Sequence, residues 1–208
     1  MKFIYRLNIF IFVLLLPIHF VYAASAPQAL ASLLNRLQSL QANFTQTVMD
    51  GRGQILQKTS GQMILQRPGR FRWEVTAPSK QLLIADGQRI WFYDIGLQQV
   101  MIQKQQTMAA NSPAALLSDS PNNLTKQFNV NFLMDVQGFY LIPKDDNALF
   151  RSITLIFQQN QLREMRLTDK LGQQTVIDFS QVKLNPSINA QTFHFVLPKD
   201  KNIEIVKG

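Results

Sequence analysis

The chain has 208 residues, of which 46% are hydrophobic, and it contains no cysteine. The absence of cysteine excludes disulfides, thiolate metal sites and a lipid attached to an N-terminal cysteine, so the apolar core must stabilise the fold. The formal charge is +8, but the basic residues are scattered, which favours a solvated surface over nucleic-acid binding; attraction to anionic lipid or to an acidic partner is the sharper alternative.

Residues 1–23 have the pattern of a secretory signal peptide. Lys2 and Arg6 precede a short apolar run over residues 9–16, and Val21-Tyr22-Ala23 offers small residues for cleavage after Ala23. The alternative is an uncleaved membrane anchor, which Pro17 and the short run disfavour. We therefore expect residues 24–208 to form the mature protein as a single domain, with a substantial core.

The first element expected in the mature chain is a helix over residues 27–44. Leucines at positions 30, 33, 34, 37 and 40 recur every three or four residues and form one apolar stripe. Pro27 suits a first helical turn, and Ser25 is a possible cap. The stripe is expected to pack on a sheet, with Leu34 and Leu37 bordering any cavity on that side.

Strands follow. Phe71, Trp73 and Val75 alternate with polar residues, which is the period of a half-buried strand. Turns are expected at Asp50-Gly51, at Arg67-Pro68-Gly69 and at Asp86-Gly87. Strands are therefore expected over residues 44–48, 53–59, 61–66, 70–75, 82–84, 90–93 and 97–103, with residues 53–59 and 61–66 paired as a hairpin.

Residues 104–126 interrupt the strand pattern. Asn111-Ser112-Pro113 is expected to open a short helix through Leu116 and Leu117, and a second helical turn is expected near Leu124. The segment has few apolar residues to bury, and thinly packed segments open more readily than a core. We take residues 113–124 as a candidate lid over the sheet.

The rest of the chain again reads as strands. They are expected over residues 128–134, 138–143, 150–158, 162–168 and 175–184, with a last strong strand through Phe193, Phe195 and Leu197 and an edge strand over 203–206. The fold class is therefore mainly β (α+β). About a dozen half-buried strands can form an unclosed antiparallel half-barrel, although an ordinary packed core is the simpler interpretation. The aromatics expected on the inner side are Phe71, Trp73, Phe92, Phe128, Phe132, Phe157, Phe179, Phe193 and Phe195.

Residues suited to catalysis are scarce. His194 is the only histidine after residue 23, and its place between two aromatics of an expected strand favours a structural role. One histidine without cysteine cannot build a zinc cluster or a Cys/His dyad, and no glycine-rich phosphate loop is present. Asp145-Asp146 could be a carboxylate pair of a hydrolase, but turn chemistry explains it better. We expect no enzyme activity, no metal and no cofactor.

One stretch carries a specific resemblance. It resembles the outer-membrane lipoprotein carrier protein (LolA) family through Arg67-Pro68-Gly69-Arg70-Phe71-Arg72-Trp73, Pro78, Asp86-Gly87 and Trp91-Phe92-Tyr93-Asp94. The match spans about forty positions in one order, unlike a lone short motif.

The resemblance implies a fold and a function. It implies an unclosed antiparallel β half-barrel with an N-terminal helix and a short helical lid over an apolar cavity that accepts the acyl chains of lipoproteins. By resemblance, Arg67 latches the lid in the empty form. Phe71 is a cavity wall residue that affects loading. The other cavity residues expected are Leu34, Leu37, Trp73, Phe92, Leu116, Leu117, Phe128 and Phe132.

The family also implies a route. A monomeric periplasmic carrier would take outer-membrane lipoproteins from the inner-membrane ABC transporter LolCDE and pass them to the outer-membrane receptor LolB, without a nucleotide or metal of its own. The alternative within the same fold is a periplasmic sensor or accessory protein that binds lipids or lipoproteins and signals.

The free energy gained by burying acyl chains limits how tightly such a carrier can hold its cargo. Burial of one methylene contributes about 0.8 kcal/mol, so one sixteen-carbon chain approaches ~12 kcal/mol. Two or three fully buried chains would reach the ceiling of non-covalent binding, near ~20 kcal/mol, and would not leave. The cavity is therefore expected to be partly closed when empty, so that opening it weakens net binding.

Overall fold

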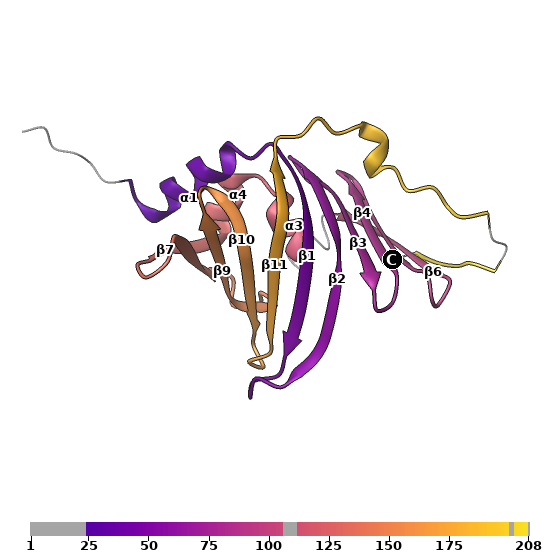
Figure 1. Cartoon of the computed structure of the whole chain (residues 1–208), viewed down its shortest axis with the longest axis horizontal. Coiled ribbons are helices and arrows are strands. Elements are labelled where there is room, and N and C mark those ends of the chain that lie inside the picture. The colour runs from indigo at the N-terminus through magenta and orange to yellow at the C-terminus, as the bar shows by residue number, and fades with distance from the viewer. Residues whose placement is uncertain (1–23, 106–111, 200–201, 208) are drawn as a thin grey trace, which may run out of the picture.

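A twelve-stranded sheet dominates the computed structural model, which describes residues 24–105, 112–199 and 202–207. The strand order is β12-β6-β5-β4-β3-β2-β1-β11-β10-β9-β8-β7 (Figure 1). β7 and β12 stand at opposite edges, so the sheet is unclosed, as the sequence predicts. The strands are β1 Ser39–Met49, β2 Ile55–Gln66, β3 Arg70–Ala77, β4 Gln81–Asp86, β5 Arg89–Asp94, β6 Gln99–Lys104, β7 Phe128–Leu133, β8 Gly138–Pro143, β9 Phe150–Gln158, β10 Gln161–Asp169, β11 Gln174–Leu184 and β12 Glu204–Lys207.

The strand pairing is antiparallel with one exception. β12 runs parallel to β6, from Glu204 beside Gln99 to Lys207 beside Ile102. β1 pairs with β2 on one side and with β11 on the other, so the first strand of the chain joins the two halves of the sheet. The edge strand expected over 203–206 is thereby confirmed.

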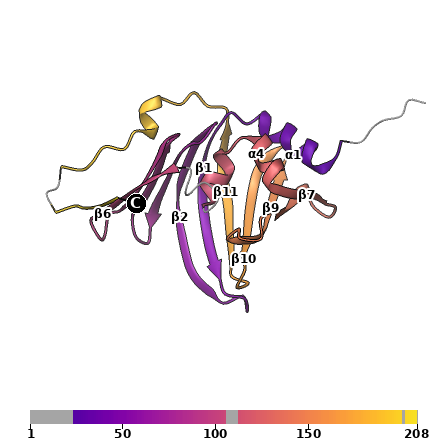
Figure 2. The same ribbon diagram turned by 180° about the vertical axis from the view of Figure 1, so that it is seen from behind.

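Among the described residues, three α-helices lie on one face of the sheet (Figure 2). They are α1 Ala26–Asn35, α3 Pro113–Ser118 and α4 Pro121–Gln127. Proline occupies the first turn of each, and serine precedes each of them as N-cap. Ser112 accepts from the Ala115 amide and Ser120 from the Asn123 amide, so these two starts are fixed by local chemistry. The expected helices at residues 113–117 and near Leu124 are confirmed.

The first helix is shorter than the sequence pattern predicts. It ends at Asn35, not at residue 44, and β1 begins at Ser39. Asn185, which follows β11, donates from its side chain to the Arg36 carbonyl (2.9 Å) and accepts from the Gln38 amide (2.9 Å). These contacts with a distant segment hold the chain in its turn, and Leu37 and Leu40 are buried outside the helix.

β2 is one continuous strand, and the expected break between residues 59 and 61 is absent. Its hairpin partner is β1, not a second half of itself. Gly61 serves a different purpose from a turn. The pairing of β2 with β3 shifts at Ser60/Gly61, and a Cβ at Gly61 would lie 1.9 Å from the Glu74 carbonyl oxygen. Only glycine permits this approach of two backbones.

Gly61→Ala should therefore destabilise the protein by about 3 kcal/mol or more, because the methyl group meets backbone that cannot move without breaking the ladder. Gly51→Ala is the matched control, since a Cβ there would meet only ordinary contacts, at 3.7 Å or more. The free energy of unfolding, measured by urea titration, tests this. Equal stability of the two variants would contradict the close approach at Gly61.

The C-terminal segment also differs from its prediction. Residues 193–197 form no strand. A 3₁₀ helix, η1 Ala190–Phe193, is followed by extended chain. Phe195 lies near Trp91 and Tyr93, with ring centroids 6.2 Å apart in both cases, and the Arg70 guanidinium lies 5.8 Å from the Phe193 ring centre. His194 is therefore not in the middle of a strand.

Candidate functional site

The two faces of the sheet have different covers. We call the face that bears Phe71, Leu155 and Met165 the helix face, because α1, α3 and α4 pack on it. Side chains alternate along each strand, so Arg70 and Trp91 belong to the opposite, outer face. Phe193 and Phe195 contact these two residues, and so the prediction that they line the inner side is wrong. The other seven predicted aromatics share the helix face by register.

A small apolar space separates the helices from the sheet. Its volume is about 10 Å³, which is about the room that one water needs. Leu34 of α1 and Leu116 and Leu117 of α3, which are among the expected cavity residues, line it together with Leu124 of α4. Leu141, Ile153, Leu155 and Met165 form the opposite wall. The helices are thus closed on the sheet, and an acyl chain can enter this space only if they move away.

The remaining predicted cavity residues are distributed over the same face. Leu37, Phe71 and Trp73 are buried, and the Trp73 ring stacks on Phe44 with centroids 3.9 Å apart. Phe92 is half-buried beside Leu83. Phe132 is 47% exposed near the end of β7, so it lies outside the closed space. None of these five lines the space beneath the helices.

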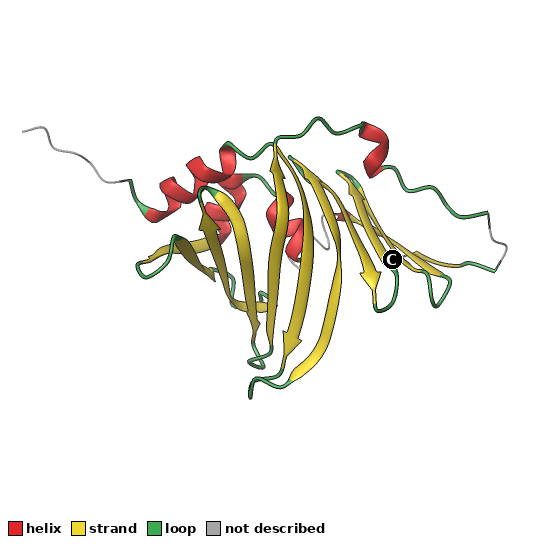
Figure 3. Cartoon of the chain, viewed as in Figure 1, coloured by secondary structure: helices red, strands yellow, loops and turns green. Residues whose placement is uncertain are grey.

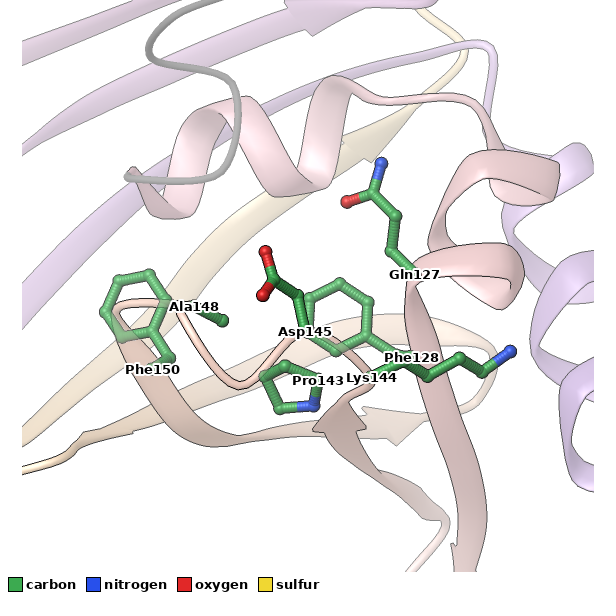
Figure 4. Close-up of a pocket in the computed structure, with 7 residues that line it drawn as sticks. All are labelled: Gln127, Phe128, Pro143, Lys144, Asp145, Ala148 and Phe150. Carbon is green, nitrogen blue, oxygen red and sulfur yellow. The ribbon is translucent and has the colours of Figure 1, made fainter.

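An open pocket of about 400 Å³ lies at the ends of α4, β8 and β9 (Figure 4). Phe128 and Pro143 are paired across β7 and β8, and Phe150 begins β9. Pro143 follows Leu141 by two residues and therefore shares its face. The predicted cavity residue Phe128 thus lines a pocket that adjoins the closed space. The complete lining is Gln127, Phe128, Pro143, Lys144, Asp145, Ala148 and Phe150.

Arg67 lies between two of the covering helices. It follows β2 directly, and its residue is 9% exposed. Nη1 donates to the Leu34 carbonyl of α1 (2.9 Å), and Nη2 and Nε donate to the Leu117 carbonyl of α3 (2.6 and 3.2 Å). These carbonyls belong to the last turns of their helices, where the helix dipole is negative. The Leu34 carbonyl also accepts from the Leu37 amide (3.1 Å). One guanidinium therefore connects both helices to the sheet.

The charge of Arg67 is poorly compensated in this position. Burial lowers its pKa to about 10, and Asp119 acts in the opposite direction. In the part of the chain that the structure describes, Arg67 forms no ion pair with a carboxylate. The side chain stays protonated at neutral pH, and its stability in this position depends on the two helix carbonyls. Any movement of α1 or α3 would expose it to water.

The turn after Arg67 adds further contacts with α3. The Gly69 amide donates to the Ser118 carbonyl (2.9 Å), and Gln105 donates to the Gly69 carbonyl (2.6 Å). Gly69 has φ of +70°, which favours glycine. Ser118 and Gln105 were not among the predicted site residues, and no local pattern marks them, because their partners are distant in the chain.

The carboxylate pair considered for a hydrolase is part of a turn. Asp145 accepts from the Asn147 amide (2.8 Å), and its carbonyl accepts from the Ala148 amide (3.1 Å). This is the Asx-turn geometry that aspartate favours. Over residues 24–105, 112–199 and 202–207, no group of three or more His, Cys, Asp or Glu could hold a metal ion. No helix in those ranges is long and apolar enough to cross a membrane.

The position of Phe193 leads to a prediction. Phe193→Ala should lower the free energy of unfolding by about 3 kcal/mol, because a fully buried ring is lost from the outer face. It should not alter the binding of an apolar ligand on the helix face, measured by fluorescence titration at a temperature where the variant is folded. Phe71→Ala is the comparison on the helix face. A selective loss of ligand binding in Phe193→Ala would contradict this assignment of faces.

The chain is similar to known proteins over most of its length. The profile of the family described as "Outer membrane lipoprotein carrier protein LolA" matches residues 35–196. Proteins named outer-membrane lipoprotein carrier protein are similar over most of the chain. One from Pseudomonas paraeruginosa is 40% identical and covers 84% of this chain and 85% of its own. One from Legionella pneumophila is 37% identical, and the match covers 96% of this chain and 98% of that protein.

Among solved structures, an uncharacterized conserved protein from Thermus thermophilus has a TM-score of 0.52 at 13% identity and covers 87% of this chain and 100% of its own. This likeness concerns the fold alone. A LolA superfamily protein from Nitrosomonas europaea has a TM-score of 0.49 at 13% identity, and the match covers 83% of this chain and 99% of that protein.

Proposed function

The chain belongs to the outer-membrane lipoprotein carrier protein (LolA) family, and we propose that it carries lipoproteins by shielding their acyl chains between the helices and the sheet. The observation that supports this mechanism is the interface beneath α1, α3 and α4. Apolar side chains line it on both the helix side and the sheet side. Arg67, which follows β2, binds carbonyls of α1 and α3 and so connects both helices to the sheet.

We propose the following cycle. The empty protein is closed, and cargo enters when α3 and α4 move away from the sheet. Opening exposes Leu116, Leu117 and Leu124 and breaks the hydrogen bonds of Arg67. The free energy that opening costs reduces the free energy gained by burying the acyl chains. The net affinity is therefore low enough for the cargo to be released. Closure after release restores the same contacts and favours handover.

The cellular route follows from the same proposal. The mature chain, without residues 1–23, would work in the periplasm as a monomer. It would receive lipoproteins from the inner-membrane ABC transporter LolCDE and deliver them to the outer-membrane receptor LolB. Residues 1–23 lie outside the described residues, so their cleavage stays a prediction. The chain would need no catalysis, metal or cofactor for this task.

A release assay tests the carrier function. Spheroplasts that synthesise labelled outer-membrane lipoproteins are incubated with the purified mature protein, and the supernatant is analysed for soluble complexes. A one-to-one complex of carrier and lipoprotein is the expected result. No release, with folded protein and an active transporter, would contradict the carrier and favour a lipid-binding sensor.

A further inference from the structure

The helix face changes character along its length. Near the Arg67 turn it presents Leu65 and Phe71, and further down Phe44 stacks on Trp73. Beyond this aromatic pair the same face presents polar, uncharged side chains. Gln46 pairs directly with Thr59 across β1 and β2, and Gln57 and Gln81 lie beside them. We call the part lined by Gln46, Gln57, Thr59 and Gln81 the polar groove.

The polar groove is hollow and uncovered. Two adjoining pockets of about 200 and 350 Å³ share Gln57, Thr59 and Gln81. The lower parts of β1 and β2 extend beyond the three helices, as Figure 2 shows. Trp73, Val75, Leu83 and Phe92 form the apolar part of the lining. The groove is thus a mixed surface that continues the apolar face beneath the helices.

Thr59 is the unusual member. Its residue is only 7% exposed, and its Oγ1 is buried without a hydrogen-bond partner among the described residues. A buried hydroxyl without a partner is destabilising, and each such group in a folded protein calls for an explanation. Thr59 lines both pockets, so a rotation about its Cα–Cβ bond would turn the hydroxyl toward a ligand lying there, which would supply the missing partner.

The neighbouring groups favour a neutral ligand with amides. Glutamine offers both a donor and an acceptor, as a peptide bond does. The charged residue of the groove's rim, Asp94, is already occupied: it accepts from Gln81 (2.8 Å) and from the Leu97 amide (3.0 Å), and these bonds lower its pKa. Gln46 and Gln57 leave their amides available toward the groove, since no protein hydrogen bond of either side chain is found within the described ranges.

The spacing fits cargo that is part lipid and part peptide. From Leu65 near α3 to Thr59 is six residues of strand, or about 20 Å. One leaflet of a bilayer holds acyl chains over about 15 Å, half of its hydrocarbon core. Chains that lie along the helix face from the lid would therefore bring their polar ends to the groove.

We propose that the polar groove binds the peptide that follows the acylated cysteine of a lipoprotein, through hydrogen bonds from its backbone amides to Thr59 and the three glutamines. This inference rests on the proposed carrier function and adds a second subsite to it. Backbone amides are common to all lipoproteins, so such a subsite would distinguish lipoproteins from free fatty acids and other lipids without reading their sequence.

The test compares two ligands in titrations with purified mature protein: a synthetic dipalmitoylated lipopeptide and palmitate. Thr59→Val keeps the shape of the side chain and removes its hydroxyl. It should weaken lipopeptide binding about three- to tenfold, as expected for one lost hydrogen bond, and leave palmitate binding unchanged. Adding Gln46→Leu should deepen the selective loss. Thr47→Val, on the outer face of β1, is the matched control and should alter neither.

Thermal unfolding gives an independent readout. Because the Thr59 hydroxyl has no partner, Thr59→Val should keep or raise the melting temperature, whereas a structural hydroxyl would lower it. The subsite would be overturned if Thr59→Val, alone or combined with Gln46→Leu, bound the lipopeptide as tightly as the wild type does. It would also be overturned if these variants lost affinity equally for the lipopeptide and for palmitate. Failure of the wild-type protein to bind either ligand would instead contradict the carrier function itself.

Discussion

Arg67→Leu should still load lipoprotein but hand it over at least about tenfold more slowly to membranes that carry the proposed receptor, LolB. The closed state loses three hydrogen bonds from a charged donor to the Leu34 and Leu117 carbonyls. Such bonds contribute about 1.5–3 kcal/mol each, and part of this is offset by the removed desolvation of the guanidinium. The leucine also adds apolar surface that cargo can contact. Both changes favour the loaded state over the closed empty state.

The measurement is transfer of labelled lipoprotein from a preformed complex to receptor-containing vesicles. Arg52→Leu removes the same charge from an exposed turn and should transfer at the wild-type rate. Arg67→Lys should lie between the two, because an ammonium cannot bond both carbonyls in the planar geometry of a guanidinium. Unimpaired transfer by Arg67→Leu would exclude Arg67 from the mechanism.

Leu124→Asp should lower lipoprotein binding at least about tenfold. Leu124 is buried in α4 against the sheet, in a space lined only by apolar side chains. Burial of an unpaired carboxylate costs several kcal/mol. The empty protein can escape this cost by leaving α4 open to water. The loaded protein cannot, because its acyl chains occupy that side of the helix, so the penalty falls on binding.

Asn122→Asp is the control on the same helix, since residue 122 is exposed and the added charge is the same. It should bind and melt like the wild type. Binding is measured by recovery of the soluble complex from spheroplasts, and stability by thermal unfolding, which should show a lower melting temperature for Leu124→Asp alone. Wild-type binding by Leu124→Asp would mean that α4 does not face the cargo.

The local parts of this fold were predictable from the sequence. Period-two alternation identified β3 and the strands after the lid, because alternation reports which side chains are buried in a strand. Ser112-Pro113 marked the start of α3, because its capping bond is made within four residues. The start of α4 at Ser120-Pro121 was not identified, although its capping bond is equally local. The turn at Arg67-Pro68-Gly69 was predictable because proline and glycine are typical turn residues, and Gly69 indeed adopts a positive φ.

Errors arose where distant segments meet. The leucine spacing from Leu30 to Leu40 is typical of a helix. Hydrogen bonds of Asn185 with residues 36 and 38 hold the chain in a turn instead, and the β1 strand begins at Ser39. Gly61 suggested a turn, whereas it allows the backbone of β3 to approach. Phe193 and Phe195 had the alternation of a strand, but they cover the outer face.

The candidate site shows the same division. The sequence by itself determined that the chain has a largely apolar sheet face, a thin helical segment between two groups of strands and an arginine in a tight turn, since composition and local spacing encode burial and turn geometry. Only the tertiary structure decided which helices close on that face, which carbonyls Arg67 binds and where Thr59 is buried. These depend on pairings between residues up to 149 positions apart, and a local pattern carries no information about the partner.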